Sequence, residues 1–341
     1  MSRPAYPQPS FAHLVRLSDD TGLLEHATGT IPLRQHGYCV DDVARGLIAI
    51  CREPDPSATL RQLADRYLAF LIHAQAENGA FHNRLSYQRV WLDRPETGDW
   101  WGRAIWGLGT AVARAAAPAL RDAAFVAFER AVHQRSRWSR SMAYAGLGAA
   151  EVLTVLPGHP GACRILADAV TTVGGPGPSA GWRWPEPRLT YANAALAEVQ
   201  LAAGEHLEDP RATVAGLDML GWLLDQETLD GHLSPVPVGG WGPGEVRPGF
   251  DQQPIEAAAL ADACARALRL TGDEGWAEGL RRSIGWFLGE NDSKVELADW
   301  RTGGGSDGLH ESGCSDNQGA ESTLALITAL QHGGRLKSNR L

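Results

Sequence analysis

Carboxylate side chains stand at the start of several alanine- and glycine-rich segments of this sequence. Asp42 opens the segment DDVARGLIAI, Asp99 precedes WWGRAIWGLG, and Asp251 precedes QPIEAAALADACARAL. Glu256 and Glu321 each lie about one turn inside such a segment. Cleavage of a glycosidic bond needs two carboxyl groups, because one protonates the leaving oxygen and the other activates water or attacks the anomeric carbon. These five residues are therefore the candidate catalytic acids, led by Asp42 and Asp99.

Each of these acids also has a purely structural interpretation. An aspartate at the start of a helix, such as Asp41 or Asp316, is a natural N-cap that complements the helix dipole. Glu256 and Glu321 are surrounded by small apolar residues, where a carboxylate is costly unless it is hydrogen-bonded or lines a wet cavity. Structural ion pairing and catalysis are both open for these two glutamates.

Other side chains in the same loops suit the hydroxyl groups and apolar faces of sugars. The sequence holds 12 Trp, and an indole offers a flat apolar face and one N–H donor, although it can equally fill gaps between helices. His26 and His36 are alternative general bases. The candidate substrate-binding residues are His36, Tyr38, Asp41, Trp100, Trp101, Arg103, Trp184, Glu186, Tyr191, Trp241, Gln252, Asp316 and Gln318.

Other reaction classes find little support. The 11 His and five Cys form no H-x-x-x-H, H-E-x-x-H or C-x-x-C spacing, so no metal site is indicated. GGGSDG at 303–308 matches the spacing of G-x-S-x-G but lacks the strand–turn–helix context of a nucleophile elbow. No Walker A loop and no G-x-G-x-x-G within a βαβ unit is found. We therefore expect no metal and no organic cofactor.

The elements that position these residues are two alternating kinds of helix. Six alanine- and glycine-rich segments start near residues 41, 100, 140, 189, 253 and 317, roughly 40 to 65 residues apart, which is typical of a repeat architecture. Between them lie stretches with one polar face, at about 10–17, 58–76, 120–134, 160–173, 210–226 and 273–288. Small residues on every side predict inner helices, and one polar face predicts outer ones. The sequence thus predicts an all-α fold, an (α/α)6 toroid with long loops at its mouth.

Composition adds to this picture. An apolar share of 44% in 341 residues supports a large core, and no linker divides the sequence. We expect one domain, with an N-terminal lead-in and short closing helix over 1–35 and the toroid over 36–335. The net charge of −9, without basic runs, argues against nucleic acid and membrane partners. The lack of an apolar leader and the odd cysteine count favour the cytoplasm.

Several local motifs resemble the six-hairpin glycosidase superfamily of (α/α)6 toroids. WWGRAIWGLG at 100–109 is similar to the Arg-Gly-x-x-Trp segment of unsaturated glycuronyl hydrolases, in which Asp99 would be the counterpart of the acid. LTYANAALAEVQL at 189–201 is similar to a Tyr-Asp-Asn-Ala segment of several toroid proteins, with Ala192 in the Asp position. HGYCVDDVARGL and SDNQGAESTLAL resemble uncharacterised bacterial toroid domains that are associated with glycosyltransferases.

The resemblance and the acids lead to one main hypothesis and two alternatives. The main hypothesis is a glycoside hydrolase that acts on a short oligosaccharide or glycoconjugate. The first alternative is a sugar epimerase or isomerase on the same scaffold, with histidine bases. The second is a non-catalytic carbohydrate-binding partner of a glycosyltransferase.

Overall fold

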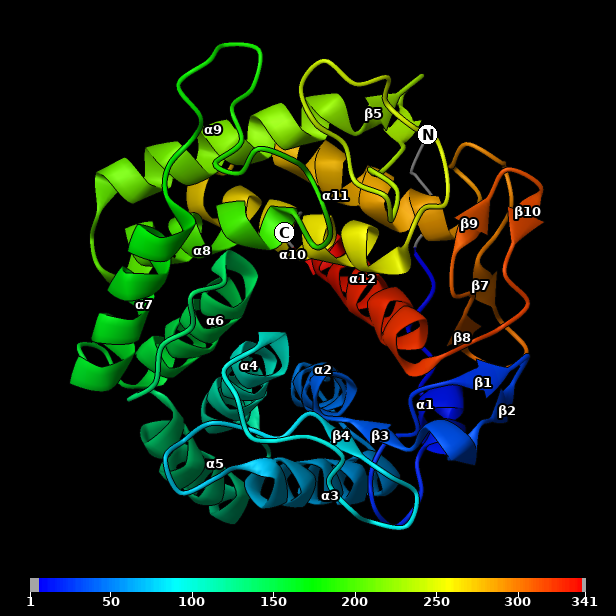
Figure 1. Cartoon of the computed structure of the whole chain (residues 1–341). Helices are drawn as coiled ribbons and strands as arrows, with labels where there is room; N and C mark the ends of the chain where they lie inside the picture. The colour runs from blue at the N-terminus through cyan, green and yellow to red at the C-terminus, as the bar shows by residue number, and fades with distance from the viewer. Residues whose placement is uncertain (1–5, 339–341) are drawn as a thin grey trace.

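Twelve α-helices make up most of the computed structural model, which describes residues 6–338. Six of them form an inner ring, and consecutive inner helices contact one another until α12 returns to α2 and closes it. The inner helices are α2 (Val40–Cys51), α4 (Asp99–Arg114), α6 (Ser139–Val155), α8 (Ala194–His206), α10 (Pro254–Thr271) and α12 (Ala320–Ser338). Figure 1 shows this ring down its axis, with the other helices around it.

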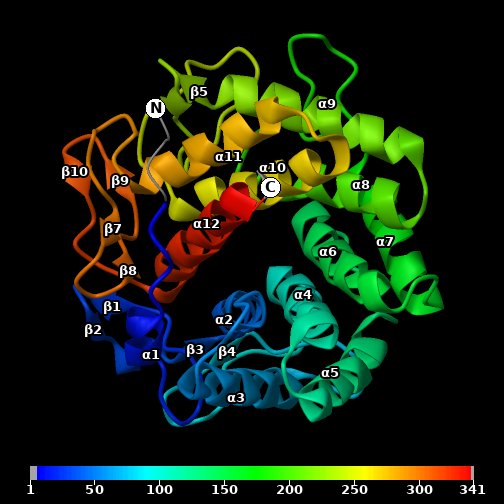
Figure 2. The same ribbon diagram turned by 180° about the vertical axis from the view of Figure 1, so that it is seen from behind.

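The outer ring follows the amphipathic stretches of the sequence closely. Its helices are α1 (Ala12–Leu17), α3 (Ala58–Ala74), α5 (Pro118–Ala131), α7 (Pro160–Val173), α9 (Pro210–Gln226) and α11 (Glu274–Phe287). The view from behind shows the same inner and outer arrangement (Figure 2). The predicted (α/α)6 toroid is confirmed. No helix in the described part of the chain is long and apolar enough to span a membrane.

One boundary differs clearly from the sequence prediction. The segment that starts at Leu189 becomes helical only at Ala194. The Asn193 side chain accepts a hydrogen bond from the Thr190 backbone N–H at 3.0 Å, and Ala192 has a φ of 44°. This local turn competes with the helix, so residues 189–193 form part of the loop layer instead.

Close backbone approach explains the small residues of the inner helices. A Cβ atom on Gly148 of α6 would lie 2.4 Å from the Ile105 carbonyl oxygen of α4, and one on Gly109 would lie 2.1 Å from the Gly148 carbonyl oxygen. These contacts involve backbone atoms, which cannot rotate away. Glycine at the crossing therefore lets α4 and α6 pack more closely than side chains would allow.

Short β-hairpins and strand pairs lie in the loops that connect the helices. Their strands are β1 (Ala27–Thr28), β2 (Ile31–Pro32), β3 (Tyr38–Cys39), β4 (Arg84–Leu85), β5 (Thr228–Leu229), β6 (His232–Leu233), β7 (Ala298–Asp299), β8 (Gly304–Gly305), β9 (Leu309–His310) and β10 (Gly313–Cys314). They form five antiparallel pairs: β1–β2, β3–β4, β5–β6, β7–β8 and β9–β10. The β5–β6 hairpin directly follows the outer helix α9.

The N-terminal segment packs directly on the ring. Helix α1 contacts α12, and the buried His13 ring bonds to the Gln318 backbone carbonyl at 2.8 Å. The Glu25 carbonyl accepts a hydrogen bond from the Ala320 N–H at the start of α12. Residues 1–5 of the predicted lead-in lie outside the described residues. The described part of that lead-in thus completes the wall beside α12.

Candidate active site

The inner helices present their N-terminal ends to one face of the ring, and an acidic cavity opens there. We call this cavity the mouth. It measures about 410 Å³. It is lined by Glu25, His26, Cys39, Asp41, Asp42, Arg45, Asn83, Arg84, Asp99, Trp100, Asp307, Gly319, Ala320, Glu321 and Ser322. Three of the five predicted catalytic acids, Asp42, Asp99 and Glu321, therefore come together.

A single guanidinium serves three carboxylates in the mouth. The Arg45 Nη2 lies 2.5 Å from Asp41 Oδ2, and the Arg45 Nη1 lies 2.8 Å from both Asp42 Oδ1 and Glu321 Oε2. Asp41 and Asp42 belong to the same turn of α2 as Arg45, whereas Glu321 reaches across from α12. Burial disfavours the charged form of Arg45, but its three carboxylate neighbours raise its pKa.

Burial favours the protonated form of Asp42. Only 4% of the residue is exposed, and burial raises the pKa of its carboxyl group to about 8. The Arg45 charge lowers this pKa, while the charges of Asp41 and Glu321 raise it further. A carboxylic acid that keeps its proton near pH 7 has the property that a general acid needs.

Asp99 is positioned by a chain of contacts across the loop layer. The Tyr191 hydroxyl donates a hydrogen bond to Asp99 Oδ2 at 2.5 Å, and burial raises the pKa of Asp99. The Arg140 guanidinium lies 4.7 Å from the Tyr191 ring centroid and donates to the Tyr191 carbonyl oxygen. Arg140 is fixed in turn by two hydrogen bonds to the Glu186 carboxylate at 2.9 and 2.8 Å. Direct contacts thus connect Asp99 to Tyr191, Arg140 and Glu186.

A narrow channel of about 50 Å³ continues below the mouth, between the inner helices. Arg103 of α4 lines it, is 7% exposed, and stacks its guanidinium 3.7 Å from the Tyr144 ring centroid. The Arg103 Nε and the Tyr144 hydroxyl have no hydrogen-bond partner among the described residues. The nearest carboxylate oxygen, Asp41 Oδ1, is 3.6 Å from that Nε. Both groups are available to hydrogen-bond a molecule that enters the channel.

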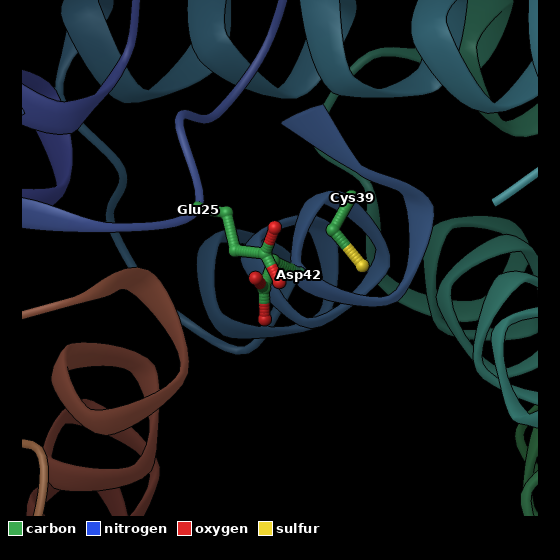
Figure 3. Close-up of side chains that lie close together, drawn as sticks. All are labelled: Glu25, Cys39 and Asp42. Atoms are coloured by element: carbon green, nitrogen blue, oxygen red, sulfur yellow. The ribbon is translucent and has the colours of Figure 1, made fainter. Parts of the chain in front are cut away.

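Two groups of side chains have the spacing that a metal ion needs. One potential ligand atom each from Glu25, Cys39 and Asp42 lie within 4.8 Å of one another, and the same holds for Asp41, Asp42 and Glu321. The first group converges from the loop between α1 and β1, from β3 and from α2 (Figure 3). Burial raises the pKa of the Cys39 thiol well above its usual range, and its Sγ contacts Asn83 Oδ1 at 3.3 Å. A metal there would have to displace the thiol proton.

Glu256 is not brought to the mouth cavity. Its buried carboxylate accepts hydrogen bonds from the Ala192 N–H and from the backbone and side-chain N–H groups of Asn193. Burial raises the pKa of Glu256 despite these bonds. These contacts join α10 to the loop that leads into α8. Of the two roles that the sequence leaves open for Glu256, they support the structural one.

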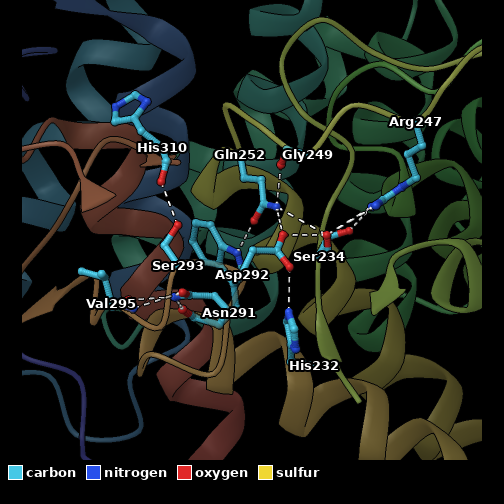
Figure 4. A network of polar contacts seen from close by, with 11 residues as sticks. His232, Ser234, Arg247, Gly249, Gln252, Asn291, Asp292, Ser293, Val295 and His310 are labelled. Atoms are coloured by element: carbon cyan, nitrogen blue, oxygen red, sulfur yellow. Dashed lines mark hydrogen bonds and ion pairs between the residues drawn. The ribbon is translucent and has the colours of Figure 1, made fainter. Parts of the chain in front are cut away.

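Gln252 and Asp251 also lie away from the mouth cavity. The fully buried Gln252 accepts a hydrogen bond from Trp286 Nε1 at 2.9 Å and donates to Asp292 and to the Gly249 carbonyl (Figure 4). Exposed Asp251 pairs with His310 at 2.7 Å. These contacts anchor the long loop before α10 to the segment after α11.

The same network contains a serine, a histidine and an aspartate without forming a hydrolytic triad. Both the His232 Nε2 and the Ser234 hydroxyl bond to Asp292, each at 2.7 Å (Figure 4). A nucleophilic serine must instead bond to the imidazole that takes its proton. The arrangement is therefore a loop anchor, in agreement with the sequence.

Of the remaining predicted binding residues, some line the mouth, some are buried and some are exposed. Trp100 lines the mouth and donates from Nε1 to the Phe81 carbonyl at 2.7 Å. Tyr38, Trp101, Trp184 and Gln318 are buried, Trp241 packs its ring against Trp182, and His36 and Asp316 are exposed. The His36 ring contacts that of His26, which lines the mouth, with centroids 4.8 Å apart.

The opposite end of the inner ring carries a second charged cluster, which we call the rear cluster. Asp262 bonds to Arg52 at 2.7 Å and to His332 at 2.6 Å, Glu151 to Arg114 at 2.8 Å, and Glu198 to Arg266 at 3.1 Å. Burial opposes ionisation of Asp262, but Arg52 and His332 lower its pKa below the usual range. Asp262, Glu151 and Glu198 therefore bond to three different arginines, and Arg266 also bonds to Glu205 at 3.1 Å.

Sequence reasoning missed several residues that shape the site. Arg45 carried a local signal, because it stands three and four residues after Asp42 and Asp41 on the predicted helix. Arg140 and Tyr144 lie in an inner segment whose small residues indicate a helix but give no sign of a site. Glu25, Asn83 and Arg84 come from loops and had no recognisable spacing.

Solved structures with a similar fold include sugar-converting enzymes and a cellulase. Cellobiose 2-epimerase from Bacillus thermoamylovorans matches with a TM-score of 0.71 and 11% identity over 96% of both chains. A D-mannose isomerase matches with a TM-score of 0.69 and 11% identity over 95% of both. The cellulase Cel9M of C. cellulolyticum, solved with cellobiose, matches at 0.64 and 8% identity over 93% of this chain and 88% of its own.

These similarities place the chain in the (α/α)6 toroid class of folds. No protein-family model matches the sequence, and no curated protein is significantly similar to it. At identities this low the similarity concerns the fold alone, and the same fold carries different chemistries in the matched proteins.

Proposed function

We propose that the protein is a glycoside hydrolase that cleaves an oligosaccharide or glycoconjugate in the mouth by carboxylate acid–base catalysis. The observation that carries the proposal is the convergence of Asp41, Asp42 and Glu321 on Arg45, with Asp42 buried and its pKa raised to about 8. The neighbours of the fold, which include a cellulase and two sugar-converting enzymes, support a sugar as the substrate.

Asp42 takes the role of general acid and donates its proton to the leaving glycosidic oxygen. Glu321 is the partner carboxylate, because it is held by Arg45 and its side chain is 41% exposed toward the cavity. Oxygens of the two side chains lie within 4.8 Å of one another. We assign Glu321 as the nucleophile, because two carboxyl groups close to the same bond suit the retaining mechanism. Asp99 binds a sugar hydroxyl.

The test combines a broad panel of glycosides and oligosaccharides with two matched variants. Asp42→Asn should lower kcat by about 10²- to 10⁴-fold, the usual contribution of a positioned proton donor. The control Asp168→Asn, in an exposed pair with Arg135, should leave kcat unchanged. NMR of the first-formed product should show the anomer of the substrate. Turnover that survives in Asp42→Asn would remove the catalytic assignment.

An epimerase or isomerase is a second candidate, because two structural neighbours, with TM-scores of 0.71 and 0.69, are a cellobiose 2-epimerase and a D-mannose isomerase. His26 lines the mouth and is in ring contact with His36, which supplies an imidazole for proton transfer. Incubation of reducing sugars with the protein in D2O separates the candidates. Deuterium at C2 without cleavage, abolished in His26→Asn, would favour this reaction over hydrolysis.

A further inference from the structure

A wide groove leads from the mouth across the starts of α4 and α6. It measures about 970 Å³ and shares Asp99 and Trp100 with the mouth cavity. Its walls come from residues near 78–80, 95–100 and 134–140, together with Glu186 and Tyr191. Small-molecule sites measure roughly 300–1,000 Å³. The groove alone is at the upper end of that range, so it adds space for more than the group that reacts in the mouth.

An exposed indole stands in this groove. Trp138 is 55% exposed and is one of the lining residues. The Arg137 guanidinium lies 4.4 Å from the Trp138 ring centroid. The flat face of an indole matches the apolar face of a sugar ring, and the position of this indole in a groove makes that face accessible to a ligand.

The backbone of Trp138 is fixed on both sides. Its N–H donates to the Ser136 hydroxyl at 3.2 Å, and its carbonyl accepts the Met142 N–H at 3.0 Å in the first turn of α6. Trp138 is also the N-cap residue of α6, the helix that carries Arg140. The indole is therefore anchored to the element that positions Tyr191 and, through it, Asp99.

Polar side chains share the groove with the indole. Thr97, Gln134 and Ser139 contribute neutral amide and hydroxyl groups, and Glu96 and Arg135 contribute charges. The Gln134 amide is held by a hydrogen bond to the Asn78 carbonyl at 2.7 Å. One aromatic platform with hydroxyl and amide groups around it suits a ligand with apolar ring faces and a hydroxylated edge.

We propose that this groove binds sugar units remote from the reacting bond, with Trp138 as the stacking platform. The substrate is then a glycan chain longer than a disaccharide, which enters the mouth from the α4–α6 side. This inference rests on the proposed function in requiring that the mouth accepts a sugar. It goes further by assigning the direction and the minimum length of the chain.

The test measures binding of the full-length protein to several series of glycans. Each series has one linkage type and runs from the monosaccharide and disaccharide to longer oligosaccharides. Trisaccharides and longer chains should bind at least about tenfold more tightly than the matching disaccharide. Trp138→Ala should abolish most of that gain, and Trp138→Tyr should restore part of it. The control Trp300→Ala removes an indole that is 44% exposed but lies outside the groove, and should change nothing.

Two kinds of failure can be told apart. Length-dependent binding that needs Trp138, without any turnover, would support the groove and reject the hydrolase. Equal binding of short and long chains, a length preference that survives in a folded Trp138→Ala variant, or no bound glycan in the panel would each overturn the groove.

Discussion

The mouth and the rear cluster lie at opposite ends of the same inner helices but balance charge in different ways. At the rear, Asp262, Glu151 and Glu198 each bond to a different arginine, namely Arg52, Arg114 and Arg266. In the mouth, Asp41, Asp42 and Glu321 share Arg45. The six inner helices thus end in paired charges on one side and in excess carboxylates on the other.

This difference separates structure from function. At the rear, burial opposes ionisation of Asp262, but Arg52 and His332 lower its pKa. Burial raises the pKa of Glu198 to about 7 despite the Arg266 charge. In the mouth, burial raises the pKa of Asp42 to about 8, and the charges of Asp41 and Glu321 raise it further. Raised pKa values of this kind are common in catalytic sites. What distinguishes the mouth is that its carboxylates converge on one guanidinium beside an open cavity.

The largest effect on stability is expected at the rear. Asp262→Asn leaves Arg52 buried without its counterion, and breaking a buried pair of this kind costs about 3–5 kcal/mol. The exposed pair Arg135–Asp168 provides the contrast, because Asp168→Asn should cost less than about 1 kcal/mol. Urea denaturation measures both. Equal losses in the two variants would show that the rear cluster does not hold the ring together.

A smaller effect is expected halfway between the two ends, at the α4–α6 crossing. Gly148→Ala places a Cβ 2.4 Å from the Ile105 carbonyl and should destabilise the protein by about 1–3 kcal/mol, the usual cost of overpacking. The matched control is Gly221→Ala in outer helix α9, where the nearest atom would be 3.7 Å away. That change should stabilise by up to about 1 kcal/mol, because alanine favours helix. Thermal unfolding should therefore shift in opposite directions.

The response to pH gives the finest comparison of the two ends. The pKa of Asp42 is about 8 in the folded state against an ordinary value of 3.8, so the folded state binds this proton more tightly. Wild-type stability relative to Asp42→Asn should therefore fall by about 1.4 kcal/mol for each pH unit between about 4 and 8.

The rear should respond with the opposite sign. The pKa of Asp262 is lowered on folding, so its contribution is present above about pH 4 and is lost as the pH falls further. Denaturation of wild type, Asp42→Asn and Asp262→Asn from about pH 2 to about pH 8 compares the two ends. Parallel curves for wild type and Asp42→Asn would contradict the protonated assignment of Asp42.

Helix positions and the closing of the ring follow from local patterns, which is why sequence reasoning found them. The stretches 160–173 and 210–226 coincide with α7 and α9, because one polar face and a proline at the start are local features. Asp42, Asp99 and Glu321 were found because carboxylates at the starts of inner helices must face the same end. Glu256 follows the same pattern, yet its carboxylate binds a neighbouring loop.

The sequence by itself determined the architecture, since periodicity and small residues specify which helices are inner and which are outer. Only the tertiary structure decided which carboxylates share a cation. Arg45 and Glu321 come from opposite ends of the chain and meet because α12 packs against α2. The charge state of Asp42 was decided in the same way, because burial and distant neighbours, not the residue type, set the pKa of a carboxyl group.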